Sequence, residues 1–396
     1  MSEWKKLKLS ECCSSIADGD HQPPPKAEAG IPFVTISNMT STNQFDFSDT
    51  LFVPQDYYDK LDEKRKARKD DILYSVVGSF GIPVFMKEDK AFVFQRHIAI
   101  LRPDNEKIVP RFLFYTMLTK DFYAKADAAA IGAAQRTVSL TALRNMEICI
   151  PDKIQQSKIV DTLAAYDDLI ENNQKQIKLL EETAQRLYKE WFVDLRFPRY
   201  EDIEIVDGVP EGWTVKSMED IADYLNGYAF KPSDWGEVGK PIIKIKELND
   251  GITKDTPRNT GDDIPEKYRV FPGDIVFSWS ATLTAKIWDA EEGLLNQHLF
   301  KVTPYDGFCR EYVLQSILKT LDEFRNLTTG STMKHIQRGK LKQVFVKVPS
   351  PKIMDEYKKY ADTIRQQILV LSHKIIILQE ARDRLLPKLM SGEIGL

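Results

Sequence analysis

The sequence predicts a mixed α/β (α+β) protein in which one domain occurs twice and each copy is followed by a long helix. Three observations predict this fold class: an internal repeat, short β-rich segments between turns in each copy, and two stretches of heptad periodicity. The chain of 396 residues is long enough for two hydrophobic cores. We therefore expect two halves related by a pseudo-two-fold axis, with the two long helices paired as an antiparallel coiled coil.

The internal repeat consists of sequence landmarks that recur in the same order. Corresponding segments are 30–39 and 239–249, 69–79 and 272–282, 94–103 and 296–304, and 131–151 and 329–349. The separation between corresponding positions shrinks along the chain, as expected when one scaffold carries loops of different length. The predicted organisation is a domain at 1–151, a long helix at 152–195, a linker at 196–212, a second domain at 213–349 and a second long helix at 350–396.

Each copy combines strands with a helical segment. Strands are expected at the apolar runs 33–37, 72–77, 242–246 and 275–280. A helical segment is expected in each copy, at 111–126 and at 310–325. This alternation is typical of a mixed α/β domain.

The segment after each domain carries core-type residues at alternating steps of four and three, which is typical of a coiled coil. In the first helix these positions are Ile159, Leu163, Tyr166, Ile170, Asn173, Ile177, Leu180, Ala184, Leu187 and Trp191. In the second helix they are Tyr357, Ala361, Ile364, Ile368, Leu371, Ile375, Leu378, Arg382, Leu385 and Leu389. Asn173 is a polar core position of the kind that fixes register, and Arg382 lies near the helix end, where its side chain can reach solvent.

Each long helix could pack on its own domain alone, but equal length and matching phase favour pairing of the two helices with each other. A parallel pair is compatible with the sequence as well. The linker 196–212 is polar and punctuated by Pro and Gly, so it permits the chain to return. For this reason we expect antiparallel pairing.

Composition and motifs exclude several classes of protein. Basic and acidic residues number 55 and 59, so net charge alone does not indicate a nucleic-acid ligand. The sequence contains no GxGxxG, Walker or HExxH motif, and no Asn/Asp-Pro-Pro-aromatic motif of the methyltransferase type. The four cysteines have no regular spacing, which argues against a disulfide framework or a zinc site. This use of cysteine fits a reducing compartment, so we expect a cytoplasmic protein. No apolar stretch is long enough for a membrane helix.

Two segments are locally basic. Segment 334–347 contains five Lys or Arg residues and no acid, and segment 60–69 contains six basic and two acidic residues. A basic run is more often a solvated surface than a binding site. The first run, however, lies at the end of the second copy, and its counterpart carries Gln135, Arg136 and Arg144. Two copies of one binding surface on a rigid spacer suit duplex DNA, which is long and two-fold symmetric.

These features resemble the specificity (S) subunit of type I restriction–modification systems along essentially the whole chain. The matching motifs are W-x-x-x-x-L at 4–9, VPEGW at 209–213, GD-I-x-x-S at 273–278, NQH at 296–298, TGSTMKHI at 329–336 and the helix end at 378–394. Their order and duplication make the resemblance specific. The first copy departs from the pattern, with Asp70-Asp71 in place of GD and Gln95-Arg96-His97 in place of NQH. We expect these departures to leave the fold intact.

The resemblance implies two target-recognition domains, each reading one half of a bipartite double-stranded DNA sequence, with the helices as spacer. It also implies a restriction system for host defence with two further kinds of subunit. Two methyltransferase (M) subunits would carry S-adenosylmethionine and methylate adenine N6, and endonuclease/translocase (R) subunits would use ATP and Mg. This chain would be a non-catalytic subunit that holds no cofactor or metal of its own and has no membrane partner.

Candidate DNA-binding residues are polar and basic side chains on loops that follow the paired strands. In the first domain they are Ser37, Asn38, Ser75, Ser79, Gln95, Arg96, Gln135 and Arg136. In the second domain they are Lys244, Lys246, Ser278, Ser280, Asn296, Gln297, Lys334, His335 and Arg338. Gln and Asn suit adenine and Arg suits guanine, while Lys334 and Arg338 are assigned to phosphate.

Two alternatives from other classes remain open on the sequence. One is a coiled-coil scaffold without sequence-specific DNA binding, which has no need of duplicated domains with divergent loops. The other is an enzyme whose catalytic part lies in another polypeptide or has been lost. The missing cofactor motif argues against that second alternative.

Overall fold

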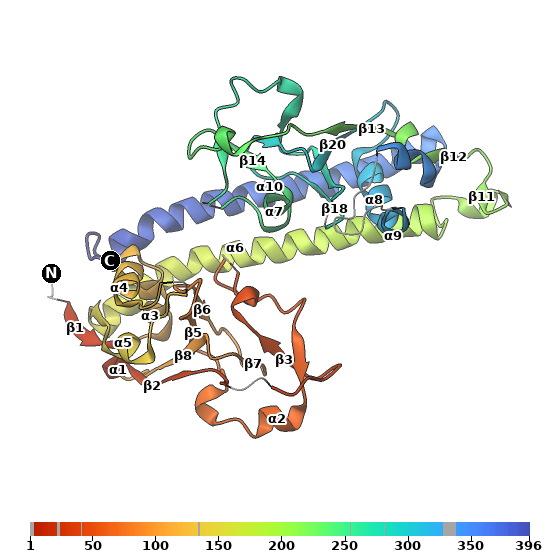
Figure 1. Ribbon diagram of the computed structural model, residues 1–396. Helices are drawn as coiled ribbons and strands as arrows, with labels where there is room; N and C mark the ends of the chain where they lie inside the picture. Colours follow the sequence, from red (N-terminus) through yellow and green to blue (C-terminus); the bar gives the residue numbers. More distant parts are fainter. Residues whose placement is uncertain are drawn as a thin grey trace. The chain divides into compact units, whose positions relative to one another are not determined.

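The computed structural model describes residues 4–21, 24–40, 42–133, 135–253, 255–280, 282–327 and 338–396 (Figure 1). The chain forms two compact units. Unit 1 comprises Met1–Asp168 and Leu378–Leu396, and unit 2 comprises Leu169–Ile377. Both boundaries fall within a long helix. Each unit therefore contains part of α6 (Lys153–Tyr188) and part of α10 (Pro351–Met390).

Unit 1 is built from short strands and helices that precede α6. Its strands are β1 (Lys5–Lys8), β2 (Cys13–Asp18), β3 (Ile31–Val34), β4 (Leu51–Val53), β5 (Ile72–Ser75), β6 (Pro83–Phe85), β7 (Val93–Phe94), β8 (Ile98–Pro103) and β9 (Glu147–Ile150). The helices before α6 are α1 (Leu9–Cys12), α2 (Gln55–Asp59), α3 (Pro110–Met117), α4 (Lys120–Ala129) and α5 (Leu140–Asn145).

Unit 2 begins within α6, which continues into a π-helical turn at Lys189–Val193. Its strands are β10 (Ile205–Val206), β11 (Val209–Pro210), β12 (Thr214–Ser217), β13 (Ala222–Asn226), β14 (Lys240–Ile243), β15 (Arg258–Asn259), β16 (Arg269–Val270), β17 (Ile275–Ser278), β18 (Thr284–Ile287), β19 (Gly293–Leu295), β20 (Leu299–Pro304) and β21 (Phe345–Val348). Its helices before α10 are α7 (Ile245–Asp250), α8 (Arg310–Lys319) and α9 (Leu321–Asn326).

The two units share one sheet topology apart from the additional strand β16 in unit 2, which supports duplication of the chain. The sheet with the longer strands, called the larger sheet, has the antiparallel strand order β2-β8-β5-β6 in unit 1 and β13-β20-β17-β18 in unit 2. The second sheet has the order β4-β3-β7 in unit 1 and β15-β14-β19-β16 in unit 2. Each second sheet contains one parallel pair, β3 with β7 and β14 with β19. A separate antiparallel pair joins the start of each domain to its end, β1 with β9 and β12 with β21.

The two predicted helical segments each contain a break that the apolar pattern did not indicate. In unit 1, Thr119 lies between α3 and α4 and caps α4, because its hydroxyl accepts a hydrogen bond from the Phe122 backbone N–H at 3.2 Å. In unit 2, Thr320 lies between α8 and α9. Threonine favours a cap over a helix interior, which explains the break at Thr119. Thr320 makes no such cap, because its hydroxyl donates back to the carbonyl oxygen of Ser316 at 2.8 Å.

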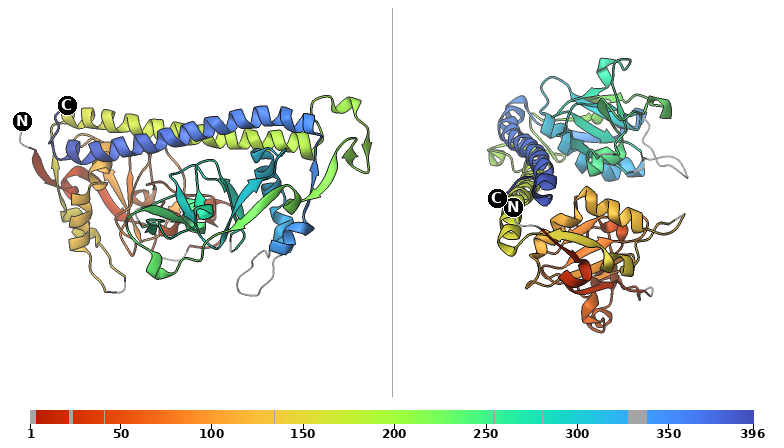
Figure 2. Two further views of the ribbon diagram at one scale, coloured as in Figure 1. Left: turned by 90° about the horizontal axis from the view of Figure 1, so that it is seen from above. Right: turned by 90° about the vertical axis from the view of Figure 1, so that its left-hand side faces the viewer.

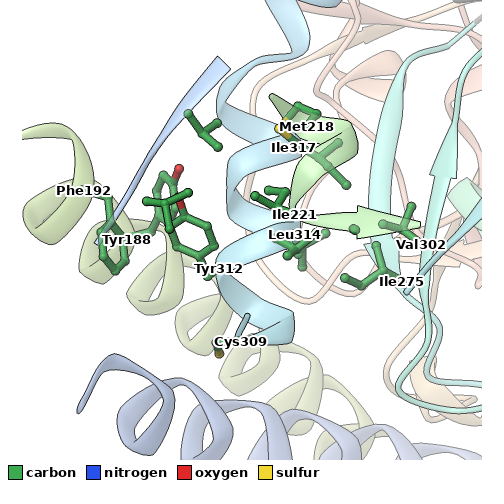
Figure 3. Packing of buried hydrophobic residues seen from close by; sticks show 14 of the residues in the cluster. Tyr188, Phe192, Met218, Ile221, Ile275, Val302, Cys309, Tyr312, Leu314 and Ile317 are labelled. Atoms are coloured by element: carbon green, nitrogen blue, oxygen red, sulfur yellow. The ribbon is translucent and has the colours of Figure 1, made fainter. Parts of the chain in front are cut away.

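The core of unit 2 is organised around α8. Figure 3 shows α8 lying between Ile275 and Val302 of the larger sheet and Tyr188 and Phe192 of the long helix and its π-helical turn. The rings of Phe192 and Tyr312 meet edge to face, with centroids 5.0 Å apart. The end of the long helix is therefore part of the domain core.

Opposite ends of α6 and α10 pack together within each unit, which makes the pairing antiparallel, as predicted (Figure 2). In unit 1, Ile159 and Leu163 near the start of α6 share a hydrophobic cluster with Leu389 near the end of α10. In unit 2, Trp191, just beyond the end of α6, lies against Tyr357 near the start of α10, with ring centroids 5.7 Å apart. A parallel pair would bring like ends together, and these contacts exclude it.

The predicted coiled-coil positions are all buried or half-buried: Ile159, Leu163, Ile170, Asn173, Ile177, Leu180, Leu187, Ile364, Ile368, Leu371, Ile375, Leu378 and Leu385. The polar Asn173 is among the buried ones. Arg382 does more than reach solvent, because its Nη1 donates a hydrogen bond to Asp167 Oδ1 of α6 at 2.9 Å. The polar core position near the end of α10 is thus held by an ion pair.

Asp70-Asp71 and Gly273-Asp274 form the same turn ahead of the central strands β5 and β17. Asp70 has a φ of +71°, in the left-handed region that Gly273 occupies at +98°. The carboxylates of Asp71 and Asp274 each accept a hydrogen bond of 2.9 Å from the backbone N–H three residues earlier. The departure from GD in the first copy therefore leaves the turn intact, as expected.

Position 70 should accept only residues that tolerate a left-handed backbone. We expect Asp70→Gly to change the free energy of unfolding by less than about 0.5 kcal/mol, and Asp70→Val to lower it by about 1–2 kcal/mol, because a β-branched residue is strained at positive φ. Urea unfolding followed by tryptophan fluorescence measures both variants. Equal stability of the two would contradict the assigned turn.

Candidate nucleic-acid interface

The turn between β7 and β8 in unit 1 (95–97) and the turn between β19 and β20 in unit 2 (296–298) share one hydrogen-bonded frame. In both units, two backbone hydrogen bonds of 2.8 and 2.9 Å tie this turn to the residue that follows a glycine, Asp20 in unit 1 and Tyr228 in unit 2. The backbone frame is the same, while the side chains on it differ. Unit 1 carries Asp20, Gln95 and Arg96, and unit 2 carries Tyr228, Asn296 and Gln297.

Gly19 and Gly227 make this frame possible. A Cβ on Gly19 would lie 2.2 Å from the carbonyl oxygen of Phe94, and one on Gly227 would lie 2.1 Å from that of Asn296. These distances leave no room for a side chain, so only glycine allows the two backbones to approach this closely. The same requirement in both units shows that the frame was retained as the copies diverged.

Two further loops of unit 1 pack beside the turn. The backbone N–H of Val76, after β5, donates to the carbonyl oxygen of His97 at 2.9 Å, and that of Gly78 donates to the carbonyl oxygen of Arg136 at 2.9 Å. The Arg136 guanidinium lies 5.5 Å from the centroid of the Phe80 ring. Three loops of unit 1 thus gather polar, basic and aromatic side chains at one place.

Asp20, Gln95, Arg96 and His97 line a cavity of about 380 Å³ next to this turn. The Tyr57 hydroxyl donates to the Asp20 carboxylate, and burial together with this bond raises the pKa of Tyr57 to about 12. Burial and the nearby Arg96 guanidinium lower the pKa of His97. The cavity wall therefore offers a carboxylate, an amide, a guanidinium and a neutral imidazole at neutral pH. Carboxylate, amide and guanidinium groups are among those that recognise base edges.

The corresponding turn of unit 2 lies among aromatic rings. The Trp279 ring, after β17, lies 5.9 Å from the His298 ring, and the Tyr228 ring lies 5.5 Å from that of Tyr268. Where unit 1 has a carboxylate at the turn, unit 2 has an aromatic face. The two units therefore present different surface chemistry on the same frame.

The candidate residues chosen from the sequence fall into three groups. Exposed or half-buried are Ser37, Asn38, Ser79, Gln95, Arg96, Gln135, Arg136, Lys244, Lys246, Gln297 and Arg338. Of these, Lys246 lies in α7, and Ser37 and Asn38 lie in a short 3-10 helix rather than on a loop. At most 6% exposed are Ser75, Ser278, Ser280 and Asn296. Lys334 and His335 lie outside the described residues.

The buried serines support the loops from inside. Ser75 Oγ accepts a hydrogen bond from the Ile82 backbone N–H at 2.9 Å, and Ser278 Oγ donates to the carbonyl oxygen of Ser280 at 3.1 Å. Neither hydroxyl is offered to a ligand in this conformation. The direct contact predicted for these serines requires exposed side chains, and the geometry gives them a supporting position instead.

Asn38 and Lys244 lie at the same region of the repeat but have different surroundings. The Asn38 amide accepts from the Thr35 backbone N–H at 2.9 Å and donates to the carbonyl oxygens of Asp46 and Asp49, both at 3.2 Å. Its polar atoms are therefore used within unit 1. The Lys244 ammonium instead lies 3.7 Å from the Trp235 ring centroid, at a half-buried position.

Sequence reasoning missed the residues on the other side of the turn, Asp20 and Tyr228, and the ring of Trp279. A signal for the first two is present. A polar residue followed by glycine occurs in both copies, as Asp18-Gly19 and Asn226-Gly227. Aligning these two glycines would have placed Asp20 and Tyr228 at equivalent positions.

Comparison with known proteins identifies the family. Residues 1–182 and 210–376 match the model of the type I restriction modification DNA specificity domain. The chain belongs to this family. The prediction of an S subunit is thereby confirmed, and the two matched ranges each begin within or just before one of the repeated domains.

Relatives and solved structures of this specificity family resemble the chain over most of its length. The MjaIX specificity subunit of Methanocaldococcus jannaschii is 24% identical over 304 residues, which are 72% of this chain and 69% of the relative. The HindI specificity subunit of Haemophilus influenzae is 23% identical over a 470-residue alignment that covers 100% of both chains. The crystal structure of a type I S subunit from M. genitalium has a TM-score of 0.53 at 15% identity, with 98% and 96% of the two chains covered. All three are specificity (S) subunits of type I systems.

The basic segment 60–69 of this specificity subunit is largely neutralised by its own acids. Lys66 Nζ lies 2.7 Å from Glu63 Oε1, Arg68 pairs with the same carboxylate, and Lys60 Nζ lies 3.0 Å from Asp56 Oδ2. Exposed pairs of this kind contribute little to stability, but they lower the positive potential of the surface. This segment is therefore a weaker candidate for DNA binding than the loops at the turn.

Among the helices that the structure describes, none is long and apolar enough to cross a membrane.

Glycine at position 227 should be essential for the frame. We expect Gly227→Ala to lower the free energy of unfolding by roughly 2 kcal/mol or more, because the new methyl group would overlap the Asn296 carbonyl. Gly339→Ala is the matched control, since a Cβ there meets nothing within 4 Å. Urea unfolding of the two variants gives the difference. A Gly227→Ala protein as stable as the control would show that the two backbones are not in close contact.

Proposed function

We propose that this specificity subunit reads a bipartite DNA target, one half with the loops of each unit. The observation that supports this is the shared frame of the two turns with different side chains on it. A scaffold that ignores sequence has no use for this divergence, whereas a reader of two different half-sites requires it. The proposal keeps the coiled-coil scaffold as the alternative function to be tested.

The side chains at the turns match known modes of base recognition. Arg96 suits the two acceptors of guanine in the major groove, and Gln95 and Gln297 suit the donor and acceptor of adenine. The Asp20 carboxylate accepts hydrogen bonds and suits the amino group of cytosine. Arg338 is exposed and pairs with Asp223 at 3.2 Å, a contact that a phosphate can replace.

The partners that we propose follow from the same division of labour. Two M subunits with S-adenosylmethionine would methylate adenine N6 at the recognised target. R subunits with ATP and Mg would translocate and cleave DNA that lacks the methyl groups. The specificity subunit would position both on the target and hold no cofactor itself, and the complex would act in the cytoplasm.

The decisive experiment maps DNA methylation in cells that contain the partner subunits. We expect a bipartite adenine-methylated motif that disappears when the gene is deleted. Arg96→Ala should relax the motif in one half and Gln297→Ala in the other half, because loss of a bidentate contact removes about 10- to 100-fold of base discrimination. Methylation-sensitive sequencing of genomic DNA determines the motif in the wild type, the deletion strain and the two variants.

Lys107→Ala serves as the control, because this exposed cation follows β8 at the end opposite the turn. The methylated motif in the Lys107→Ala strain should be the same as in the wild type. If deletion of the gene removes no methylated motif although an active M subunit is present, the scaffold alternative stands. Relaxation of the same half by both variants would contradict the assignment of one half to each unit.

Arg338 should contribute affinity without specificity. We expect Arg338→Ala to weaken binding to all duplexes alike and to reduce the slope of log K against log salt concentration by about 0.9, the value for one phosphate contact. Fluorescence anisotropy with target and non-target duplexes across a salt series measures both quantities. A change in the ratio of the two affinities would mean that Arg338 contacts a base.

A further inference from the structure

In unit 1 the domain meets the long helix through a basic residue on α3. Arg111 Nη2 donates to Asp168 Oδ1 of α6 at 2.9 Å and lies 3.7 Å from Asp167 Oδ2. The Asp167 carboxylate also accepts hydrogen bonds from the Tyr115 hydroxyl at 2.6 Å and from Arg382 at 2.9 Å. The side chains of Arg111 and Asp167 are 18% and 16% exposed. The pair of Arg111 with Asp167 is therefore largely shielded from water, whereas Asp168, which is 60% exposed, extends the contact to the surface.

In unit 2 the domain meets the long helix through an acidic residue on α8. The Glu311 carboxylate pairs with the Arg365 guanidinium of α10 and accepts a hydrogen bond from Gln315 Nε2 at 2.7 Å. The side chains of Glu311 and Arg365 are 5% and 9% exposed. The position that corresponds to Arg382 is occupied by Ala184, which is buried.

These two contacts occupy equivalent positions of the repeat. Arg111 and Glu311 are each the second residue of their helix, because α3 begins at Pro110 and α8 at Arg310. Asp167 and Arg365 lie equally far from the starts of α6 and α10. The contact is therefore the same in both units, but its charges are reversed.

We infer that this reversed ion pair directs each domain onto its own long helix during folding. The inference does not depend on the proposed function. A domain on the wrong helix would place Arg111 against Arg365, or Glu311 against Asp167. Both arrangements bring like charges together at a site largely closed to water and leave each without its partner, which is strongly unfavourable.

The apolar contacts around this site cannot make the same distinction. Phe112 and Tyr312 are equivalent and fully buried, as are Leu163 and Ala361. Hydrophobic burial is not directional, and residues of this kind can repack against either helix. In a duplicated chain, the polar contact makes the correct arrangement much lower in free energy than one in which each domain packs on the other long helix.

The test transplants the contact residues between the units of the full chain. The contact set is Arg111, Tyr115, Asp167, Asp168 and Arg382 in unit 1, and Glu311, Gln315, Arg365, Gln366 and Ala184 at the same positions in unit 2. The first variant, called the duplicate, gives unit 1 the residues of unit 2 (R111E, Y115Q, D167R, D168Q and R382A). The second variant, called the exchange, also gives unit 2 the residues of unit 1 (E311R, Q315Y, R365D, Q366D and A184R).

The two variants and the wild type are unfolded in urea and refolded by dilution, and the yield of native monomer is measured by size exclusion. The duplicate should lose about threefold or more in yield, because both domains now fit both helices, whereas the exchange should recover most of the wild-type yield. The exchange carries more substitutions than the duplicate, so general damage to the protein cannot explain such a recovery. An exchange that refolds no better than the duplicate would overturn the inference.

A smaller variant keeps the test valid if the full sets fold poorly. E311R/R365D retains an ion pair in unit 2 but gives it the polarity of unit 1, and it should lower the refolding yield. The matched control is E380R/R384E, which reverses an exposed pair of α10 whose side chains are 63% and 82% exposed. Equal yields for this control and for E311R/R365D would also overturn the inference.

Discussion

The packing of one domain helix on the paired long helices is the constraint on which the rest of each unit depends. In unit 2, the rings of Tyr188 and Phe192 complete the core on one side of α8, and the larger sheet completes it on the other. In unit 1, Ile159 and Leu163 of α6 and Leu389 of α10 belong to the core that α3 enters. Without the long helices, the core of each domain would be incomplete. The position of the loops beyond the sheet therefore depends on how the domain packs on the coiled coil.

The backbone of the turn is the same in the two units, whereas the side chains on it differ. Gly19 and Gly227 hold the β2–β8 and β13–β20 regions against their turns at a distance that no side chain tolerates. Because the backbone is fixed by glycines and by main-chain hydrogen bonds, the turn side chains can change without loss of the frame. Asp20 and Tyr228 differ in charge and size at the same backbone position. A change of surface chemistry at the turns therefore needs few substitutions in this fold.

The sequence predicted the duplication, the central strands and the antiparallel helices, because each produces a periodic or repeated pattern that survives without tertiary contacts. It did not predict the breaks at Thr119 and Thr320, because the apolar pattern continues across both residues. At Thr119 a side-chain cap competes with that pattern, and at Thr320 the hydroxyl bonds back to Ser316. Ser75 and Ser278 follow apolar residues at strand ends, and their burial depends on how the next loop folds back. The pairing of Glu311 with Arg365 depends on which helices meet, and no spacing within one helix reveals it.

The copies have diverged at two places with different physical requirements. At the turns, the frame is made by main-chain hydrogen bonds, so the side chains can change without breaking it. At the contact between domain and helix, the charges are shielded, and one cannot change sign without its partner. Arg111 with Asp167 and Glu311 with Arg365 are two self-consistent solutions of that second problem. Divergence at the turns gives the two halves different surface chemistry on one frame, whereas divergence at the helix contact occurs in charge pairs that stay complementary within each unit.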